Sequence, residues 1–445
     1  MAKDMTVDKE WKVILFFSLP ILFGNLIQHL YTIVDGIIIG QVVGDLALSA
    51  VGTSFPLIIL FLAFAFGLSA GSGVLIAQNF GAKRFARLRA ASSTSLILIT
   101  GLGILFSALA VLLSPLFFRH ILHVPEALFN MALTYFQIFS LGIVFQFVFN
   151  GVAAILRSVG DAKVTLYFLM FTSILNVALT LLAVVTLDFG IVGAAWTTVI
   201  SKFVSAVIAY VYMVRKYDYL RPQWQFDRSL CSLILRLGLP ISLQNGFASI
   251  AFMATGRLVN SFGIVSIAAY TVAMRIDGFA FMPMLAFNAS INTFTGQNIG
   301  ANRLDRVRAG LWQTLMMALV SGFVLIGILF LFAPVFVRLF GLEGDMLARA
   351  VAQIRFVTPF YILLIPSLVF IGMMKGAGDV VFSTVAISVE LALRVALSYL
   401  LVHLGVLGYS AVWVTFPIGW ALLLVLAIYR LRSGKWQTKS LLGGE

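Results

Sequence analysis

The chain has 445 residues, of which 61% are hydrophobic and only 11% are charged, and its mean hydropathy is +1.05. A water-soluble protein of this length cannot cover its surface with so few polar groups, and a membrane β-barrel alternates apolar and polar residues instead of grouping them. The single cysteine, Cys231, rules out an intramolecular disulfide and a cysteine-based metal site.

Apolar segments long enough to cross a hydrocarbon core of about 30 Å as helices follow one another along the whole chain. The first is too long for the apolar part of a cleavable signal peptide, so we expect a permanent helix. The fold class is therefore an all-α polytopic membrane protein. The twelve predicted transmembrane helices are residues 12–39, 49–79, 90–117, 128–156, 164–186, 190–213, 232–259, 265–298, 310–333, 346–373, 382–403 and 408–430.

Lysine and arginine are distributed unevenly over the predicted loops. The amino terminus, every second loop and the carboxy terminus hold 22 of them, whereas the intervening loops hold only Arg119 and Arg338. The positive-inside rule then predicts that both termini are cytoplasmic. The net charge of +13 is mainly a topology signal, and we expect no nucleic-acid partner.

The two halves of the sequence resemble each other at a nearly constant offset. Pro20 and Pro240 are 220 residues apart, and Asp161 and Asp379 are 218 apart. Repeated matches at one offset indicate duplication of a six-helix unit, and an even number of helices gives both copies the same orientation in the membrane. We predict two pseudo-symmetric six-helix lobes forming a parallel repeat. Their bounds are residues 1–213 and 232–445, joined by a cytoplasmic linker at 214–231.

Two lobes joined by a linker are typical of transporters, in which the substrate binds between the repeats near the middle of the membrane. A duplicated scaffold without transport is the alternative. "GLSAG" (67–71) matches the G-x-S-x-G pattern of serine hydrolases, but it lies inside an apolar helix instead of following a strand. Since the sequence has no phosphate-binding loop and no H-E-x-x-H zinc motif, we expect no enzyme and no cofactor.

We single out seven ionisable residues inside the predicted helices, where a charge needs a partner or a water-filled cavity. Glu390 and Arg394 are four residues apart, which favours an ion pair along one helix and leaves ligand contact as the alternative. Arg275 and Asp277 are two apart and cannot share a helix face, and their depth in the membrane stays open. The seven residues are Asp35, Asp277, Glu390, Lys202, Arg257, Arg275 and Arg394.

Asp35 has no basic residue three or four positions away. It continues a polar stripe on the first helix that includes Gln28 and either Tyr31 or Thr32. An apolar surrounding disfavours the charged form of a carboxylate, so such a group can take up and release a proton, or bind a sodium ion. A carboxylate at the membrane interface is the alternative. Pro20 can bend the same helix and would then move the end that holds Asp35, so we predict a hinge there.

Three segments resemble the multidrug and toxic compound extrusion (MATE) family of transporters. They are "LYTIVDGIIIGQVVG" (30–44), the paired loop signatures "AQNFGAKR" (77–84) and "GQNIGANR" (296–303), and the run from "ILNVAL" to "FGIVGAAWTTVIS" (174–201). The resemblance implies an antiporter with a V-shaped pair of six-helix lobes. It would export amphipathic, often cationic organic compounds in exchange for inward H⁺ or Na⁺.

The resemblance also implies an ion-coupling site in the amino-terminal lobe. Asp35 matches the family's aspartate on the first helix, Asn176 its asparagine on the fifth, and Thr198 its threonine on the sixth. Thr180 stands where relatives often have a second aspartate, which leaves H⁺ and Na⁺ open. We expect Asp35, Asn176, Thr180, Thr198 and Tyr31 to form the site, with Asp35, Asn176 and Thr198 as ligands if the ion is Na⁺.

The other polar residues inside the helices are assigned to the substrate cavity or to structure. Arg257 lies on the helix where some relatives have a glutamate, so we expect no cation site of that kind in the second lobe. The residues assigned in this way are Gln28, Arg257, Arg275, Asp277, Glu390 and Arg394.

We expect a monomer in the cell membrane whose partners are the lipid bilayer and small, amphipathic, cationic compounds. The alternative is a flippase of related fold for lipid-linked precursors, which would line its cavity with basic residues that bind a pyrophosphate. Lys202, Arg257, Arg275 and Arg394 are the residues that support this alternative. A passive channel is a third reading, which concentrative transport would exclude.

Overall fold

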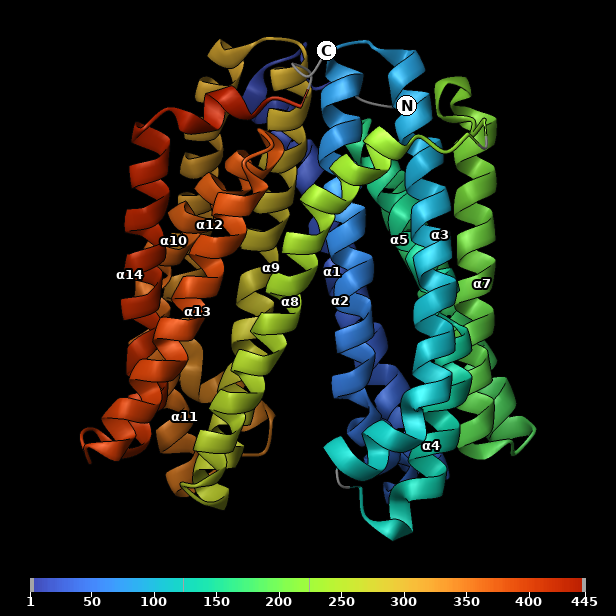
Figure 1. Cartoon of the computed structure of the whole chain (residues 1–445). Helices are drawn as coiled ribbons and strands as arrows, with labels where there is room; N and C mark the ends of the chain where they lie inside the picture. The colour runs from blue at the N-terminus through green and yellow to red at the C-terminus, as the bar shows by residue number, and fades with distance from the viewer. Residues whose placement is uncertain (1–3, 123, 224, 442–445) are drawn as a thin grey trace. The chain divides into compact units, whose positions relative to one another are not determined.

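A computed structural model describes residues 4–122, 124–223 and 225–441 of the chain. Within these ranges the chain forms fourteen α-helices and no β-strand (Figure 1). In the first half they are α1 (Glu10–Ile38), α2 (Asp45–Gly81), α3 (Phe85–Leu116), α4 (Glu126–Leu141), α5 (Ile143–Ser158), α6 (Ala162–Thr180) and α7 (Gly190–Lys216). In the second half they are α8 (Arg228–Asn260), α9 (Ile264–Gly300), α10 (Leu304–Leu339), α11 (Gly344–Val357), α12 (Tyr361–Gly376), α13 (Val380–His403) and α14 (Ala411–Arg432).

Eleven helical segments of the described chain are long and apolar enough to cross a membrane, and α4 with α5 forms a twelfth that is bent by 42°. The bend falls at Gly142, where an added Cβ would lie 3.2 Å from the side chain of Val199 on α7. Because glycine has no side chain, the corner can pack closely against α7. The prediction of an all-α fold with twelve transmembrane helices is confirmed, with the fourth helix broken.

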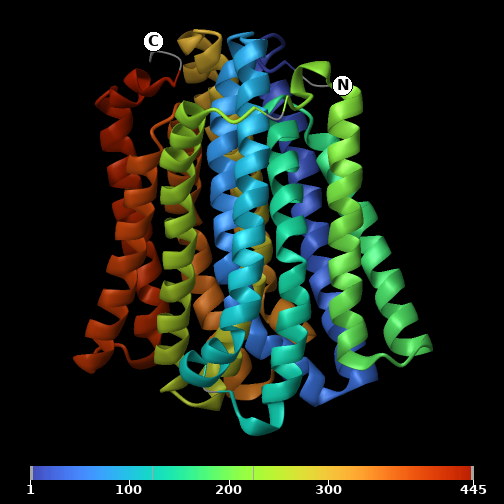
Figure 2. The same ribbon diagram turned by 45° about the vertical axis from the view of Figure 1, so that its right-hand side comes forward.

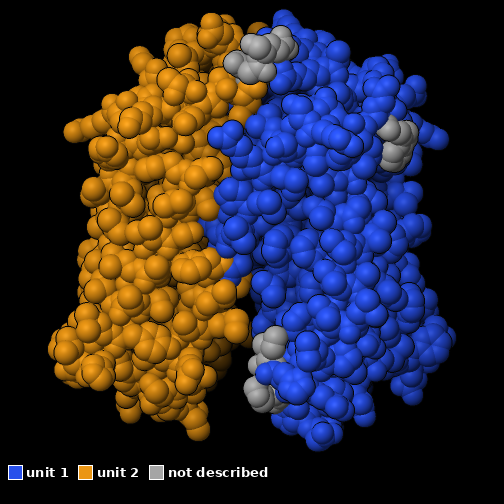
Figure 3. Space-filling model, in the orientation of Figure 1, with its two compact units in different colours: residues 1–4, 23–246 blue, residues 5–22, 247–445 orange. Residues whose placement is uncertain are grey.

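The contacts divide the chain into two compact units, coloured separately in Figure 3. Unit 1 is built mainly from residues 23–246, and unit 2 from residues 5–22 and 247–445. Both α1 and α8 therefore begin in one unit and end in the other. The lobe bounds expected from the sequence stay a prediction, because a sequence repeat does not show which unit each half of a helix packs against.

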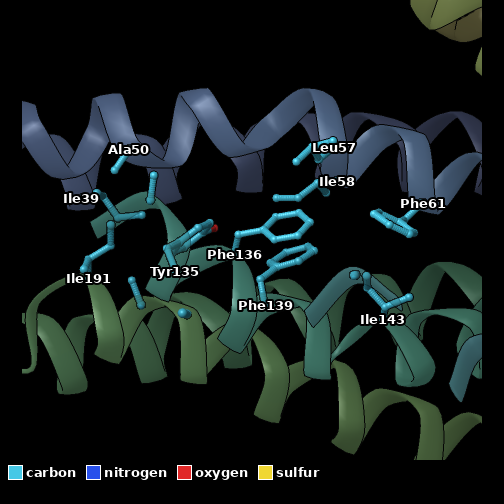
Figure 4. Close-up of a cluster of buried hydrophobic side chains, with 14 of the residues drawn as sticks. Ile39, Ala50, Leu57, Ile58, Phe61, Tyr135, Phe136, Phe139, Ile143 and Ile191 are labelled. Carbon is cyan, nitrogen blue, oxygen red and sulfur yellow. The ribbon is translucent and has the colours of Figure 1, made fainter. Parts of the chain in front are cut away.

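Unit 1 has a hydrophobic core between α2, α4, α5 and α7 (Figure 4). The ring of Phe61 on α2 lies 6.3 Å from that of Phe136 on α4, and Phe139 lies one turn further along α4. These aromatic side chains are buried, as their size and lack of charge favour. The α6 and α7 helices run side by side at the right of Figure 2.

Three helices of unit 1 end in a wide π-helical turn. One turn follows α3 at Phe117–Ile121. The other two follow α1 at Ile39–Val43 and α6 at Leu181–Thr186, and these two turns contact each other. Turns of this type interrupt the regular hydrogen bonding of a helix and are frequent near functional sites. The turns after α1 and α6 lie directly beyond Asp35 and Thr180.

Unit 2 explains one of the two loop signatures. The Gln297 Oε1 atom accepts a hydrogen bond of 2.9 Å from the Met5 backbone, and the Asn298 amide donates one of 3.2 Å back to Met5. Arg306, at the start of α10, forms an ion pair of 2.9 Å with Glu10. The second "GQN" motif therefore fastens the amino-terminal segment to unit 2.

Candidate functional site

The α6 and α7 helices of unit 1 are joined by polar side chains in the middle of two apolar segments. The Asn176 amide on α6 donates to Ser201 Oγ at 3.0 Å and to Thr198 Oγ1 at 3.5 Å on α7. One turn away, the hydroxyl groups of Thr180 and Thr197 are 2.9 Å apart. All five are buried, so these mutual hydrogen bonds limit the cost of removing them from water.

Beside these contacts lies a cavity of about 60 Å³, large enough for water-sized ligands. Most of the residues that line it have polar side chains, and they come from α1, α5, α6 and α7. The polar residues around it are Gln28, Tyr31, Gln146, Thr172, Ser173, Asn176, Thr198, Ser201, Lys202 and Ser205.

Asp35 stands at this site with an acceptor that is not satisfied. The Thr180 hydroxyl interacts with its carboxylate, yet Asp35 Oδ1 is buried without a partner among the described residues. The Asn176 Oδ1 atom is also buried without a hydrogen-bond partner among the described residues. Two buried oxygen acceptors without donors are costly unless water, a proton or a cation satisfies them.

Lys202 brings a positive charge into the same cavity. Its ammonium group lies 3.9 Å from the centre of the ring of Phe139, an aromatic residue of the core. It also interacts electrostatically with Asp35. The sequence lists it among the charged residues of the helices but does not place it in the coupling site. Its position four residues after Thr198 could have indicated that it belongs to this site, because residues four apart share a helix face.

The five residues expected to form the coupling site are thus brought together in unit 1, and Gln28 joins them. Of the two candidates for the polar stripe on α1, Tyr31 lines the cavity, whereas the Thr32 hydroxyl donates to the Gln28 backbone of its own helix. No group of three or more His, Cys, Asp or Glu side chains that would suit a metal ion occurs in the described part of the chain.

Unit 2 holds the remaining acids as isolated pairs. The Tyr361 hydroxyl on α12 donates to Asp277 Oδ1 on α9 at 2.5 Å, and Asp277 is buried. Arg275, whose depth the sequence left open, is exposed. The predicted ion pair is present, with 3.8 Å between Glu390 and Arg394. Arg257 is exposed on α8.

Comparison with known proteins gives the family. The MatE family model matches residues 20–182 and 240–400, which lie in both halves of the sequence. The probable multidrug resistance protein YoeA of Bacillus subtilis is 28% identical over 446 residues, covering 97% of this chain and 95% of YoeA. The probable multidrug resistance protein YpnP of the same organism is 29% identical over 382 residues, 85% of each chain.

Solved structures agree over almost the full length. One is the outward-facing conformation of a multidrug resistance MATE family transporter of the MOP superfamily, with a TM-score of 0.91, 26% identity and 98% of both chains covered. Another is a MOP superfamily transporter from Pyrococcus furiosus, described as having a binding pocket of reverse polarity, with a TM-score of 0.91, 25% identity and the same coverage. Because the family model matches both halves and the folds agree throughout, this chain belongs to the MatE family of membrane transporters, as the resemblance predicted.

Proposed function

We propose that this transporter is a secondary antiporter that exports amphipathic, cationic organic compounds in exchange for inward protons. The observation that supports it most directly is the cavity of unit 1, where Asp35 faces two kinds of partner. Neutral hydroxyl and amide groups surround it, and the Lys202 ammonium group supplies a positive charge. A single carboxylate in such a place is suited to bind and release one monovalent cation per cycle.

Lys202 is the reason for choosing the proton over the sodium ion. The cavity has the oxygen ligands that sodium needs, in Asp35, Asn176 and Thr198. A resident ammonium group, however, repels a second cation and already neutralises the carboxylate. A proton neutralises Asp35 by a covalent bond and needs no coordination shell.

In the proposed cycle, Asp35 is ionised when it interacts with Lys202, and a proton that enters from outside neutralises it. Protonation removes the attraction for Lys202 and so changes how α1 is held against α6 and α7. Pro20 is the proposed hinge, because it lies in the interior of α1 and only two residues before the helix passes from unit 2 to unit 1. Movement of α1 would expose the site to the two sides of the membrane in turn.

The substrate class and the orientation follow from the family and from the charge distribution. The relatives described above are named as probable multidrug resistance proteins, and the 22 basic residues of alternate loops favour cytoplasmic termini in the cell membrane. We propose that the chain acts as a monomer. Two of the four basic residues that support the flippase alternative already interact with an acid of the chain. Arg394 pairs with Glu390, and Lys202 interacts with Asp35.

Transport by purified protein in liposomes tests the proposal. With a cationic dye inside and an imposed pH gradient, Asp35→Asn should reduce gradient-driven efflux by about 100-fold or more, because the amide cannot exchange a proton. The matched control is Asp188→Asn, which changes an exposed acid between α6 and α7 that has a positive φ of 52°. Asparagine tolerates that conformation, so this variant should transport normally. Intact efflux by Asp35→Asn contradicts the proposed role, and transport of a lipid-linked pyrophosphate instead of the dye would favour the flippase.

A further inference from the structure

A second cavity lies at one end of unit 2. It occupies about 280 Å³ where α10 begins and α14 ends. The short helical turn Lys435–Lys439, which follows α14, forms one wall. Two arginines and two tryptophans line it, namely Arg308 and Trp312 on α10, Arg432 at the end of α14, and Trp436.

Both arginines are free to bind an anion. Arg308 and Arg432 are exposed, and neither has a hydrogen-bond or ion-pair partner in the part of the chain that the structure describes. Among the residues that the structure describes, none that lines the cavity is acidic. The nearest acid in sequence, Asp305, is 3.5 Å from Arg303 instead. Two guanidinium groups at one cavity without a counter-charge form a site for a group with negative charge.

The cavity is formed by specific packing of the chain. Gly434 has a positive φ of 66°, which turns the backbone back toward α10 after α14. Trp436 is then 2% exposed, and its indole donates to the Leu431 carbonyl at 3.3 Å. The end of this segment packs against Gly378, whose φ of 97° also requires glycine.

The apolar surroundings indicate what the anion is attached to. On α10 the exposed residues Trp312, Met316, Val320 and Val324 repeat every four positions and form one outward face. On α14, Val425 and Tyr429 do the same. Faces of this kind contact lipid tails in a membrane protein, and tryptophan is favoured at the level of the headgroups. Both faces end at an arginine of the cavity.

The equivalent position of unit 1 is closed. Arg89 lies 219 residues before Arg308 and donates to the Asp218 carbonyl at 2.8 Å. One turn further along α3, Ser93 accepts a hydrogen bond of 3.0 Å from the Gln223 backbone. The linker between the halves therefore satisfies and covers this face in unit 1. In unit 2 the corresponding arginine stays available.

We propose that this cavity binds the phosphate group of an anionic phospholipid. The phosphate lies between Arg308 and Arg432, and the acyl chains follow the exposed faces of α10 and α14. Clusters of basic residues at the ends of transmembrane helices attract anionic lipids, and each such charge strengthens binding about fivefold. Arginine adds paired hydrogen bonds to the phosphate oxygens. The two guanidinium groups also repel the ammonium group of a zwitterionic headgroup, which makes the site selective for a lipid with a net negative charge.

Native mass spectrometry of the delipidated full chain tests this directly. Phosphatidylglycerol and phosphatidylcholine with identical acyl chains are titrated against the wild type, Arg308→Gln, Arg432→Gln and the double variant. The wild type should retain phosphatidylglycerol preferentially. Each single variant should lose about fivefold in affinity and the double variant about 25-fold. The matched control is Arg338→Gln, an exposed arginine at the other end of α10, which should bind as the wild type does.

A second measurement, fluorescence quenching, tests where the lipid binds and does not depend on how much lipid the protein retains in total. Phosphatidylglycerol with brominated acyl chains should quench tryptophan fluorescence, and the quenching should fall in Trp312→Phe. Equal phosphatidylglycerol affinity in the double variant and in Arg338→Gln overturns the proposal, as does equal affinity of the wild type for both lipids. Displacement of phosphatidylglycerol by millimolar inorganic phosphate would show a site for free phosphate and would also overturn it. None of these outcomes depends on transport, so they are independent of the proposed antiport.

Discussion

The α6–α7 pair of unit 1 and the α13–α14 pair of unit 2 are copies of one another at an offset of 218 residues. One contact is the same in both. The hydroxyl groups of Thr180 and Thr197 are 2.9 Å apart in unit 1, and those of Ser398 and Thr415 are 2.8 Å apart in unit 2. The contact that fixes how the two helices pack has therefore been kept.

One turn away from that contact the two pairs differ completely. Asn176 of unit 1 corresponds to Arg394 of unit 2, and Lys202 corresponds to Trp420. Arg394 is paired with Glu390 and lies 4.6 Å from the centre of the Phe416 ring. In unit 2 Arg394 has its counter-charge, Glu390, on the same helix, whereas in unit 1 Asp35 and Lys202 come from different helices.

This difference distinguishes charges that stabilise the fold, as in unit 2, from charges that can respond to movement, as in unit 1. An ion pair within one helix stays together whatever the neighbouring helices do, so it can stabilise unit 2 without responding to movement. A pair divided between α1 and α7 changes its energy whenever α1 moves. We infer that duplication kept the helix packing in both halves and that the charge suited to coupling is in unit 1.

The loop aspartates Asp161 and Asp379 show the same pattern on a smaller scale. Asp161 accepts a hydrogen bond of 2.6 Å from the Tyr217 hydroxyl, whereas Asp379 binds Arg430 at 2.6 Å. Burial, together with the hydrogen bond to Asp161, raises the pKa of Tyr217 above its ordinary value, so the phenol stays a donor in alkaline solution. The repeat preserved the acid, and each unit supplied a different partner.

Breaking the ion pair of unit 2 should have the largest effect on stability. Arg394→Met leaves Glu390 buried without its counter-charge, which should cost about 3 kcal/mol of unfolding free energy. The measurement is denaturant-induced unfolding in detergent. Arg257→Met, which removes an exposed arginine of the same unit, is the matched control and should change little.

The double variant Glu390→Gln with Arg394→Met removes both charges and should recover most of the loss. If Arg394→Met is as stable as Arg257→Met, the pair does not have the structural role given to it, and the contrast between the two units fails.

Removing the charge of Lys202 should change the coupling ion. A unit charge about 8 Å away in a medium of effective dielectric constant about 20 contributes about 2 kcal/mol to the binding of a cation, or about 30-fold in affinity. Lys202→Met should therefore allow a sodium gradient to drive efflux and reduce the share driven by a pH gradient. Dye efflux from liposomes under separate Na⁺ and H⁺ gradients measures both.

Two variants make this prediction specific. Lys202→Arg keeps the charge and should keep the ion dependence of the wild type. Lys216→Met removes an exposed lysine from the end of the same helix and should have no effect. An unchanged preference for H⁺ in Lys202→Met would show that Lys202 does not select the ion.

The sequence predicted those contacts that depend only on the spacing of residues along one helix. Residues four apart share a face, so the Glu390–Arg394 pair could be expected before the structure was known. The twelve apolar segments followed from length and hydropathy alone, and the resemblance supplied Asp35 as the central acid.

The sequence could not show contacts that depend on how helices rotate and bend against one another. The approach of Lys202 to Asp35 requires the relative orientation of α1 and α7, which no local pattern specifies. The passage of α1 from unit 2 to unit 1 at Leu22 is likewise a property of packing. The corner at Gly142 stayed hidden because the apolar segment around it is continuous in sequence.

The smallest predicted effect concerns the contact that both units share. Thr180→Val and Ser398→Ala each remove one buried hydroxyl and leave its partner, Thr197 or Thr415, without that hydrogen bond. Each should cost about 1 kcal/mol of unfolding free energy, and the two losses should be similar. Only Thr180→Val should also slow gradient-driven efflux, because the Thr180 hydroxyl interacts with the Asp35 carboxylate as well. Thr180→Ser, which keeps the hydroxyl, should retain transport. If Ser398→Ala impairs efflux as strongly as Thr180→Val at equal stability, the shared contact serves transport in both units, and coupling is not confined to unit 1.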